Sequence, residues 1–162
     1  MITNRNLHID TFDTLAMPLD VFIGESVAVL GIKGSGKTNT AAVLIEELLT
    51  LGLPLTIVDI EGEYWGLKEK FEILVVGRSS NVDLEVNAAQ VGKIAEFSVQ
   101  HGISVILDLS DFNQEEMFDL LLSYFKSLWD TCFIARRPYE IVLEEAHEFV
   151  PQTVRTPLKE ML

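Results

Sequence analysis

The stretch GIKGSGKT at residues 31–38 decides the fold of this chain. Its spacing is G-x-x-x-x-G-K-[ST], in which the glycines let backbone N–H groups converge on phosphate oxygens. In this pattern Lys37 reaches the β and γ phosphates of a nucleoside triphosphate, and the Thr38 hydroxyl binds Mg²⁺. ATP and Mg²⁺ are therefore the predicted cofactors, and the predicted nucleotide-binding residues of the loop are Gly31, Ile32, Lys33, Gly34, Ser35, Gly36, Lys37, Thr38 and Asn39.

The flanking sequence favours a true phosphate site over a chance match in a glycine-rich turn. Residues 26–30 (SVAVL) form a short apolar run, typical of a buried parallel strand. Residues 40–51 (TAAVLIEELLTL) favour a helix that ends at Gly52, with Pro54 just beyond. Strand, glycine loop and helix are the context that this motif requires.

Apolar strands and helices alternate along the rest of the chain. Strands are predicted at residues 55–59, 73–76, 82–86, 103–109 and 139–143. Helices are predicted at residues 88–101 and from Asn113, a capping residue with Glu116 at the capping-box position, to about residue 135. The alternation predicts an α/β fold with a mostly parallel sheet and helices on both faces.

Acidic residues follow several of the predicted strands, where ligands bind in such folds. Two strands compete to supply the acid that holds the Mg²⁺ shell: one offers Asp108, and the other offers Glu144 and Glu145. We assign Glu144 to the metal and Glu145 to the attacking water. A solvated turn is the alternative for the pair, and a cap or loop hydrogen bond is the alternative for Asp108.

Three further polar residues near these strand ends have two interpretations each. Asp59 or Glu61 would bind a water near the γ phosphate, or would stabilise a turn by side-chain capping. His147 would be structural, or would relay the state of the γ phosphate to a neighbour. The Arg136–Arg137 pair would lie in a solvated loop, contact DNA, or contact the nucleotide of an adjacent subunit.

Composition limits the class of protein. The chain has 162 residues, 48% of them hydrophobic, which is enough for one domain with a core. Its apolar runs stay short of the ~18 residues of a membrane span, and its N-terminus lacks the features of a secretory signal. The single cysteine, Cys132, suits a reducing compartment and the role of buried filler. We expect a cytoplasmic protein with no membrane partner.

The net charge of −13 argues against a large basic surface for nucleic acid. It leaves double-stranded DNA as a candidate partner, since a ring-shaped motor can contact DNA with a few residues at a central pore.

The order of motifs, GIKGSGKT, VDIEGEYWGL, SVILDLSDF and IVLEEAHEFVP, resembles the HerA/FtsK-type ATPases, and the HerA branch in particular. The resemblance covers residues 26–151 and implies a P-loop NTPase fold of the RecA/ASCE-like class. It implies that Lys37 and Thr38 bind phosphate and Mg²⁺, that Glu144 is the Walker B acid, and that Glu145 is the catalytic base. Such proteins are hexameric rings that move double-stranded DNA, and some act beside a nuclease or another effector.

Two departures from the family pattern shape the expected domain organisation. Residues 1–25 are too few for the N-terminal β-barrel of many family members, so we expect a short strand or hairpin leading into an ATPase core at residues 26–162. A sensor residue and an arginine finger, which lie downstream in the family, are not found, so we expect a C-terminally incomplete core with slow turnover.

Two other functions compete with the DNA translocase. A regulatory or scaffolding ATPase that organises an effector agrees better with the acidic charge. A small-molecule kinase is disfavoured, because such enzymes need a mobile basic lid and few arginines are available late in the chain.

Overall fold

The computed structural model describes residues 6–9 and 16–149. The chain divides into two compact units, Met1–Leu53 and Pro54–Leu162, which we describe separately. The stretch TPLKEML at residues 156–162, whose sequence predicts the start of a helix, lies outside the described residues. The expected division into residues 1–25 and 26–162 stays a prediction.

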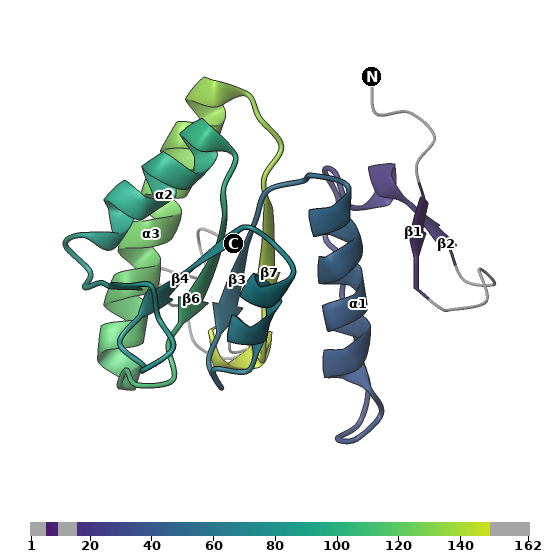
Figure 1. The fold of residues 1–162 in the computed structure, drawn as a ribbon, viewed down its shortest axis with the longest axis horizontal. Helices are drawn as coiled ribbons and strands as arrows, with labels where there is room; N and C mark the ends of the chain where they lie inside the picture. Colours follow the sequence, from purple (N-terminus) through teal and green to yellow (C-terminus); the bar gives the residue numbers. More distant parts are fainter. Residues whose placement is uncertain (1–5, 10–15, 150–162) are drawn as a thin grey trace. The chain divides into compact units, whose positions relative to one another are not determined.

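The first unit contains a small hairpin and one long helix (Figure 1). Strand β1 (Asn6–His8) pairs antiparallel with β2 (Ala16–Pro18), and a 3₁₀ turn, η1 (Leu19–Val21), follows. Helix α1 (Lys37–Thr50) begins three residues earlier than expected, directly after Gly36. The backbone N–H of His8 donates to Glu47 Oε2 at 3.1 Å, which ties β1 to α1.

The strand predicted at residues 26–30 is wrong for this structure. The segment has no regular secondary structure, and all five of its residues are exposed. A short apolar run becomes a strand only where a neighbouring strand accepts its backbone hydrogen bonds. None of the strand pairings among the described residues includes this segment.

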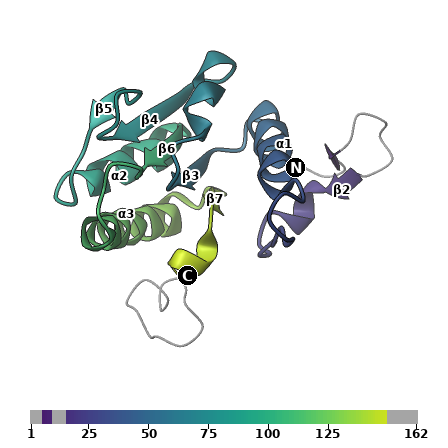
Figure 2. The ribbon, with the colours of Figure 1, turned by 90° about the horizontal axis from the view of Figure 1, so that it is seen from below.

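The second unit is built on a five-stranded sheet (Figure 2). Its strands are β3 (Leu55–Asp59), β4 (Ile73–Gly77), β5 (Leu84–Glu85), β6 (Ser104–Asp108) and β7 (Glu140–Leu143). They run in the order β5-β4-β6-β3-β7, and every pair is parallel. This confirms the mostly parallel α/β fold that the alternation of strands and helices predicts.

Helices α2 (Val91–His101) and α3 (Gln114–Ala135) pack against each other on one face of this sheet (Figure 2). The core beneath them includes Val58, Val105 and Leu107, which the alternation of strand side chains turns toward the helices. Ile57 and Ile106 point to the opposite face and are also fully buried. The sheet is therefore covered on both faces, as a parallel sheet must be.

Two 3₁₀ segments complete the described part of this unit. The first, η2 (Tyr64–Glu69), lies against β4 and β6 and buries Tyr64 and Leu67. The second, η3 (Ala146–Glu148), follows β7. Of the helices in the described part of the chain, none combines the length and apolar character that crossing a bilayer requires.

The ends of α3 account for several predicted residues. Asn113 and Glu116 form the expected capping box, in which Asn113 Oδ1 accepts from the N–H of Glu116 at 3.0 Å. Arg136 ends the helix in the left-handed conformation. Arg137 Nη1 donates to the carbonyl oxygens of Val99 at 3.1 Å and Gln100 at 3.4 Å, so its guanidinium caps the C-terminus of α2.

Candidate nucleotide site

The phosphate loop depends on its glycines. Gly34 and Gly36 have φ angles of 78° and 88°, in the left-handed region that glycine tolerates best. A Cβ atom on Gly31 would lie 2.3 Å from Ser35 Oγ, so a larger residue there would force the Ser35 side chain to move. The sequence therefore adopts a tight loop whose backbone leads directly into α1.

The N-terminus of α1 suits an anion. Gly36 is the N-cap residue and offers no side-chain hydrogen bond, and the first turn contains no acidic residue. The first N–H groups of a helix lack intrahelical acceptors, and the helix dipole favours negative charge at this end. Lys37, Thr38 and Asn39 form this first turn, so the residues present fit a phosphate group.

Asp59, at the end of β3, stabilises a turn. Its side chain is fully buried, with Oδ1 accepting from the N–H of Gly62 at 2.7 Å and Oδ2 from the N–H of Tyr64 at 2.9 Å. These contacts match the turn-capping alternative. Its role toward a nucleotide stays a prediction.

Asp108, at the end of β6, is held by hydroxyl and amide donors. Its Oδ1 accepts from the N–H of Ser110 at 3.1 Å and from Ser110 Oγ at 2.6 Å, and its Oδ2 accepts from Ser79 Oγ. The side chain is almost completely buried. This geometry is that of a loop hydrogen-bonding residue, the alternative to a metal ligand.

Glu144, directly after β7, has the environment of a cation ligand. Its N–H donates to the carbonyl oxygen of Val58 at 3.3 Å, while its buried Oε2 has no hydrogen-bond partner among the described residues. Burial raises the pKa of Glu144 to about 7, and the negative charges of Asp59, Glu63 and Glu61 add to this shift. A buried acceptor without a donor in an acidic surrounding calls for a proton or a metal ion.

The described residues contain no group of three or more His, Cys, Asp or Glu side chains that could hold a metal ion by themselves. Mg²⁺ usually keeps several waters and binds through one or two carboxylates together with substrate phosphates. A single acid such as Glu144 therefore fits Mg²⁺ better than it fits a metal that needs an all-protein cage.

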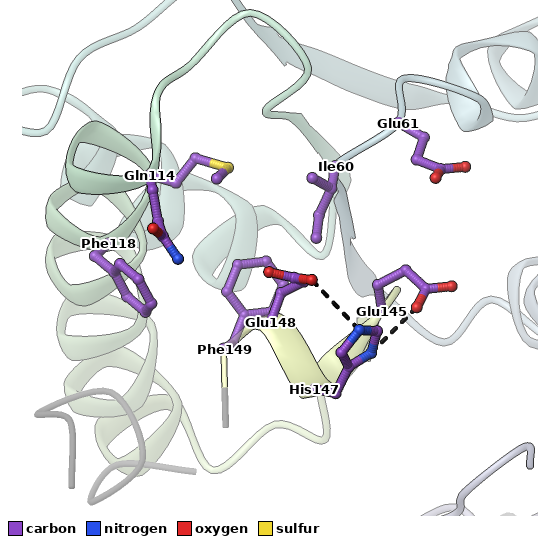
Figure 3. A pocket seen from close by; sticks show the side chains of 9 residues that line it. Ile60, Glu61, Gln114, Phe118, Glu145, His147, Glu148 and Phe149 are labelled. Carbon is purple, nitrogen blue, oxygen red and sulfur yellow. Dashed lines mark ion pairs between the residues drawn. The ribbon is translucent and has the colours of Figure 1, made fainter. Parts of the chain in front are cut away.

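Glu145 diverges from its neighbour. Its backbone is in the left-handed conformation, with φ of 46° and ψ of 46°, and its side chain is exposed. His147 Nδ1 lies 3.2 Å from Glu145 Oε2, and His147 Nε2 lies 3.3 Å from Glu148 Oε1 (Figure 3). The adjacent acids thus lie in different surroundings: Glu144 has an oxygen buried inside the protein, and Glu145 faces solvent.

A pocket of 260 Å³ lies beside Glu145 (Figure 3). It combines an apolar wall with a polar, mainly acidic one, and its lining residues are Ile60, Glu61, Gln114, Met117, Phe118, Glu145, His147, Glu148 and Phe149. The structure thus places Glu61 and Glu145, two predicted site residues, around the same pocket. The lining from α3 is not evident from the sequence, because it depends on how α3 packs beside η3.

Tyr64 is a further residue near the acids that sequence reasoning missed. Burial raises the pKa of Tyr64, and the charges of Glu144, Asp59 and Glu63 raise it further, so the phenol lies in the electrostatic surroundings of Glu144. The signal that would have identified Tyr64 is the turn after β3. In this turn Gly62 adopts a φ of 72°, and Asp59 accepts hydrogen bonds from the N–H groups of Gly62 and Tyr64.

Comparison with known proteins relates this chain to two groups. An adenylyl-sulfate kinase of Synechococcus sp. (strain JA-3-3Ab) is 27% identical over 84 residues, which are 52% of this chain and 44% of the kinase. The chain thus aligns with less than half of that relative's length. No solved structure matches it. The family model described as "Helicase HerA, central domain" matches residues 8–151. This match covers most of the sequence, so the chain belongs to the family of the HerA helicase central domain and is a HerA-type P-loop ATPase.

Proposed function

We propose that this chain is the ATP-binding core of a ring ATPase that uses Mg-ATP hydrolysis to move double-stranded DNA. The observation that carries the proposal is the tight glycine loop leading into the uncapped N-terminus of α1, in a chain of the HerA family. The kinase match supports nucleotide binding in general. A hexameric ring and a cytoplasmic location are part of the proposal.

Each predicted residue has a role in this proposal. Lys37 holds the β and γ phosphates, and Thr38 and Glu144 hold Mg²⁺. When bound, Mg²⁺ neutralises charge on the phosphates. Glu145 accepts a proton from the attacking water, which its exposed position beside the pocket supports. Glu61 binds a water near the γ phosphate, and Asp59 fixes the turn that carries Glu61.

A regulatory or scaffolding ATPase is the second candidate function. The net charge of −13 favours it, since a DNA-binding surface requires positive charge. In this case the ring would organise a partner such as a nuclease or another effector, with little movement of DNA.

The test is Mg-ATP hydrolysis by the chain, with and without double-stranded DNA, compared with Glu145→Gln. Loss of a general base costs on the order of 10²–10⁴ in rate, so Glu145→Gln should abolish measurable turnover while nucleotide binding persists. Glu115→Gln, at an exposed position on α3, is the matched control.

The outcomes separate the candidate functions. Turnover that DNA stimulates supports the translocase, and turnover that ignores DNA supports the regulatory ATPase. Transfer of phosphate to an acceptor other than water would indicate a kinase instead. Full activity in Glu145→Gln would show that Glu145 is not the base, and tight binding without turnover in both proteins would limit the chain to nucleotide binding.

A further inference from the structure

The buried Asp59 and Asp108 occupy equivalent positions at the ends of neighbouring strands. They are partners in the parallel register of β3 and β6, and the N–H of Leu109 donates to the carbonyl oxygen of Asp59 at 2.8 Å. Each carboxylate accepts hydrogen bonds from the residues that follow its own strand. The two aspartates therefore fix the turn after β3 and the loop after β6 side by side.

Gly62 lies where this turn and this loop meet. Its N–H donates to Asp59 Oδ1 at 2.7 Å, on the side of β3. A Cβ atom on Gly62 would lie 3.1 Å from Ser110 Oγ and 3.5 Å from Asp108 Oδ1, on the side of β6. The backbone of the turn is thus packed directly against the Ser110 hydroxyl, with almost no space for a side chain between them.

The Ser110 side chain is itself held in place. Its Oγ donates to Asp108 Oδ1 at 2.6 Å, and its N–H donates to the same oxygen at 3.1 Å. Asp108 Oδ2 accepts from Ser79 Oγ, which fixes the other side of the carboxylate. Hydrogen bonds to a charged acceptor are stronger than those between neutral groups. Ser110 is therefore a fixed support for Gly62, although its residue is exposed.

The contact between Gly62 and Ser110 joins two segments that line the pocket beside Glu145. Glu61 directly precedes Gly62, and Gln114, the first residue of α3, closely follows Ser110 in the sequence. Both Glu61 and Gln114 line the pocket (Figure 3). The position of Glu61 relative to the start of α3 is therefore set through Gly62 and Ser110.

The turn needs such a support because it is crowded with negative charge. Glu61 and Glu63 flank Gly62 in the sequence. Burial raises the pKa of Glu144, and the charges of Glu63 and Glu61 raise it further, so these carboxylates act on one another. Like charges repel, and water screens the repulsion less where the groups are partly buried. Without an opposing contact, this repulsion would push Glu61 away from Glu144.

We propose that Ser110 is a positioning residue for Glu61, an inference that rests on the proposed function, in which Glu61 binds a water near the γ phosphate. The Ser110 hydroxyl, anchored on Asp108, supports the turn at Gly62 and so keeps Glu61 at the pocket. Ser110 acts only through this turn. Its loss should therefore change the chemical step of hydrolysis more than the binding of the nucleotide.

Amide hydrogen exchange, followed by NMR, tests the support without any turnover. The N–H groups of Gly62 and Tyr64 both donate to Asp59, so their exchange measures how often the turn opens. We expect several-fold faster exchange of these two amides in Ser110→Ala, with the protection of β3 and β6 unchanged, and the native rate in Ser110→Thr, which keeps the hydroxyl. Ser80→Ala, at an exposed serine after β4, is the matched control. Native exchange of both amides in Ser110→Ala would overturn the proposal.

Steady-state kinetics of Mg-ATP hydrolysis tests the link to Glu61. Ser110→Ala should lower kcat several-fold with little change in KM, and Ser110→Thr should restore kcat. In a Glu61→Gln background, Ser110→Ala should cost nothing further, because the carboxylate that it positions is gone. An unchanged kcat in Ser110→Ala, or a loss that persists in full in this background, would overturn the positioning role and leave the proposed function intact. Full kcat in Glu61→Gln would instead show that the proposed role of Glu61 is wrong, and the positioning role with it.

Discussion

Glu144 is the residue at which burial and charge act together. Its Oε2 is buried without a partner, and three other carboxylates, those of Asp59, Glu61 and Glu63, raise its pKa in addition to burial. Protonation relieves this situation in the free protein, and a divalent cation would relieve it in the nucleotide-bound one. A proton and Mg²⁺ would therefore compete for the same oxygen.

The raised pKa makes the stability of the protein depend on pH. Between the ordinary value of 4.5 and about 7, the native state binds more protons than the unfolded state, so the free energy of unfolding falls as the pH rises. The stabilisation is complete below pH 4.5 and is lost as the pH passes about 7. Glu144→Gln imitates the protonated acid and should remove this loss.

We predict that Glu144→Gln is more stable than the wild type at pH 8 and equally stable at pH 4.5. The difference at pH 8 should be about 1 kcal/mol, since solvent screening of this partly buried side chain reduces the full linkage value. Urea denaturation at the two pH values measures it, without nucleotide or metal. Glu115→Gln controls for the loss of one negative charge, and a pH-independent difference would contradict the explanation.

The acid pair shows how far sequence reasoning reaches at this scale. The two neighbouring acids past the end of a strand were assigned different roles, and the structure shows Glu144 with a buried oxygen and Glu145 exposed. The left-handed backbone of Glu145 and its ion pair with His147 could not be predicted, because each depends on how the chain turns into η3.

Helix α3 is the element that the sequence defines best, because its local signals agree. Asn113 and Glu116 exchange two hydrogen bonds in the capping box, and Glu116 Oε1 also accepts from Arg78 Nη1 at 2.8 Å. We predict that Asn113→Ala destabilises the protein by about 1 kcal/mol, the usual cost of losing an N-cap side chain. Chemical denaturation measures this, with the exposed Gln114→Ala as control; equal stability of the two variants would show that the box contributes nothing.

An apolar run predicts a strand correctly only where a neighbouring strand pairs with it. Residues 55–59 and 103–109 are apolar runs, and the corresponding β3 and β6 pair with each other and are fully buried. Residues 26–30 have the same apolar pattern but form no strand, because no described strand pairs with them. The 3₁₀ segment η2 was not predicted, because its sequence has no helical spacing of apolar residues. The hydrogen bond from the N–H of Tyr64 to Asp59 and the packing of Tyr64 and Leu67 create it.

At the scale of the whole molecule, the predicted nucleotide residues divide between the two compact units. The phosphate loop with Lys37 and Thr38 belongs to the first unit, and Glu144 and Glu145 belong to the second. If the nucleotide uses both sets, its binding links the stability of one unit to that of the other. A ligand present at 100 times its Kd stabilises the native state by about 2.7 kcal/mol.

We therefore predict that Mg-ATP raises the melting temperature of the wild-type chain, and that Lys37→Ala and Glu144→Gln each remove most of this rise although they lie in different units. In the proposed site Lys37→Ala would lose the contact with the phosphates, whereas Glu144→Gln would lose the carboxylate expected to bind Mg²⁺, so the latter should keep a small rise with ATP alone. Differential scanning fluorimetry at pH 8, with Mg-ATP and with ATP alone, measures these two variants beside the charge-matched controls Lys93→Ala and Glu115→Gln. A rise that Lys37→Ala abolishes but Glu144→Gln leaves intact would mean that the first unit binds the nucleotide without the acid pair of the second.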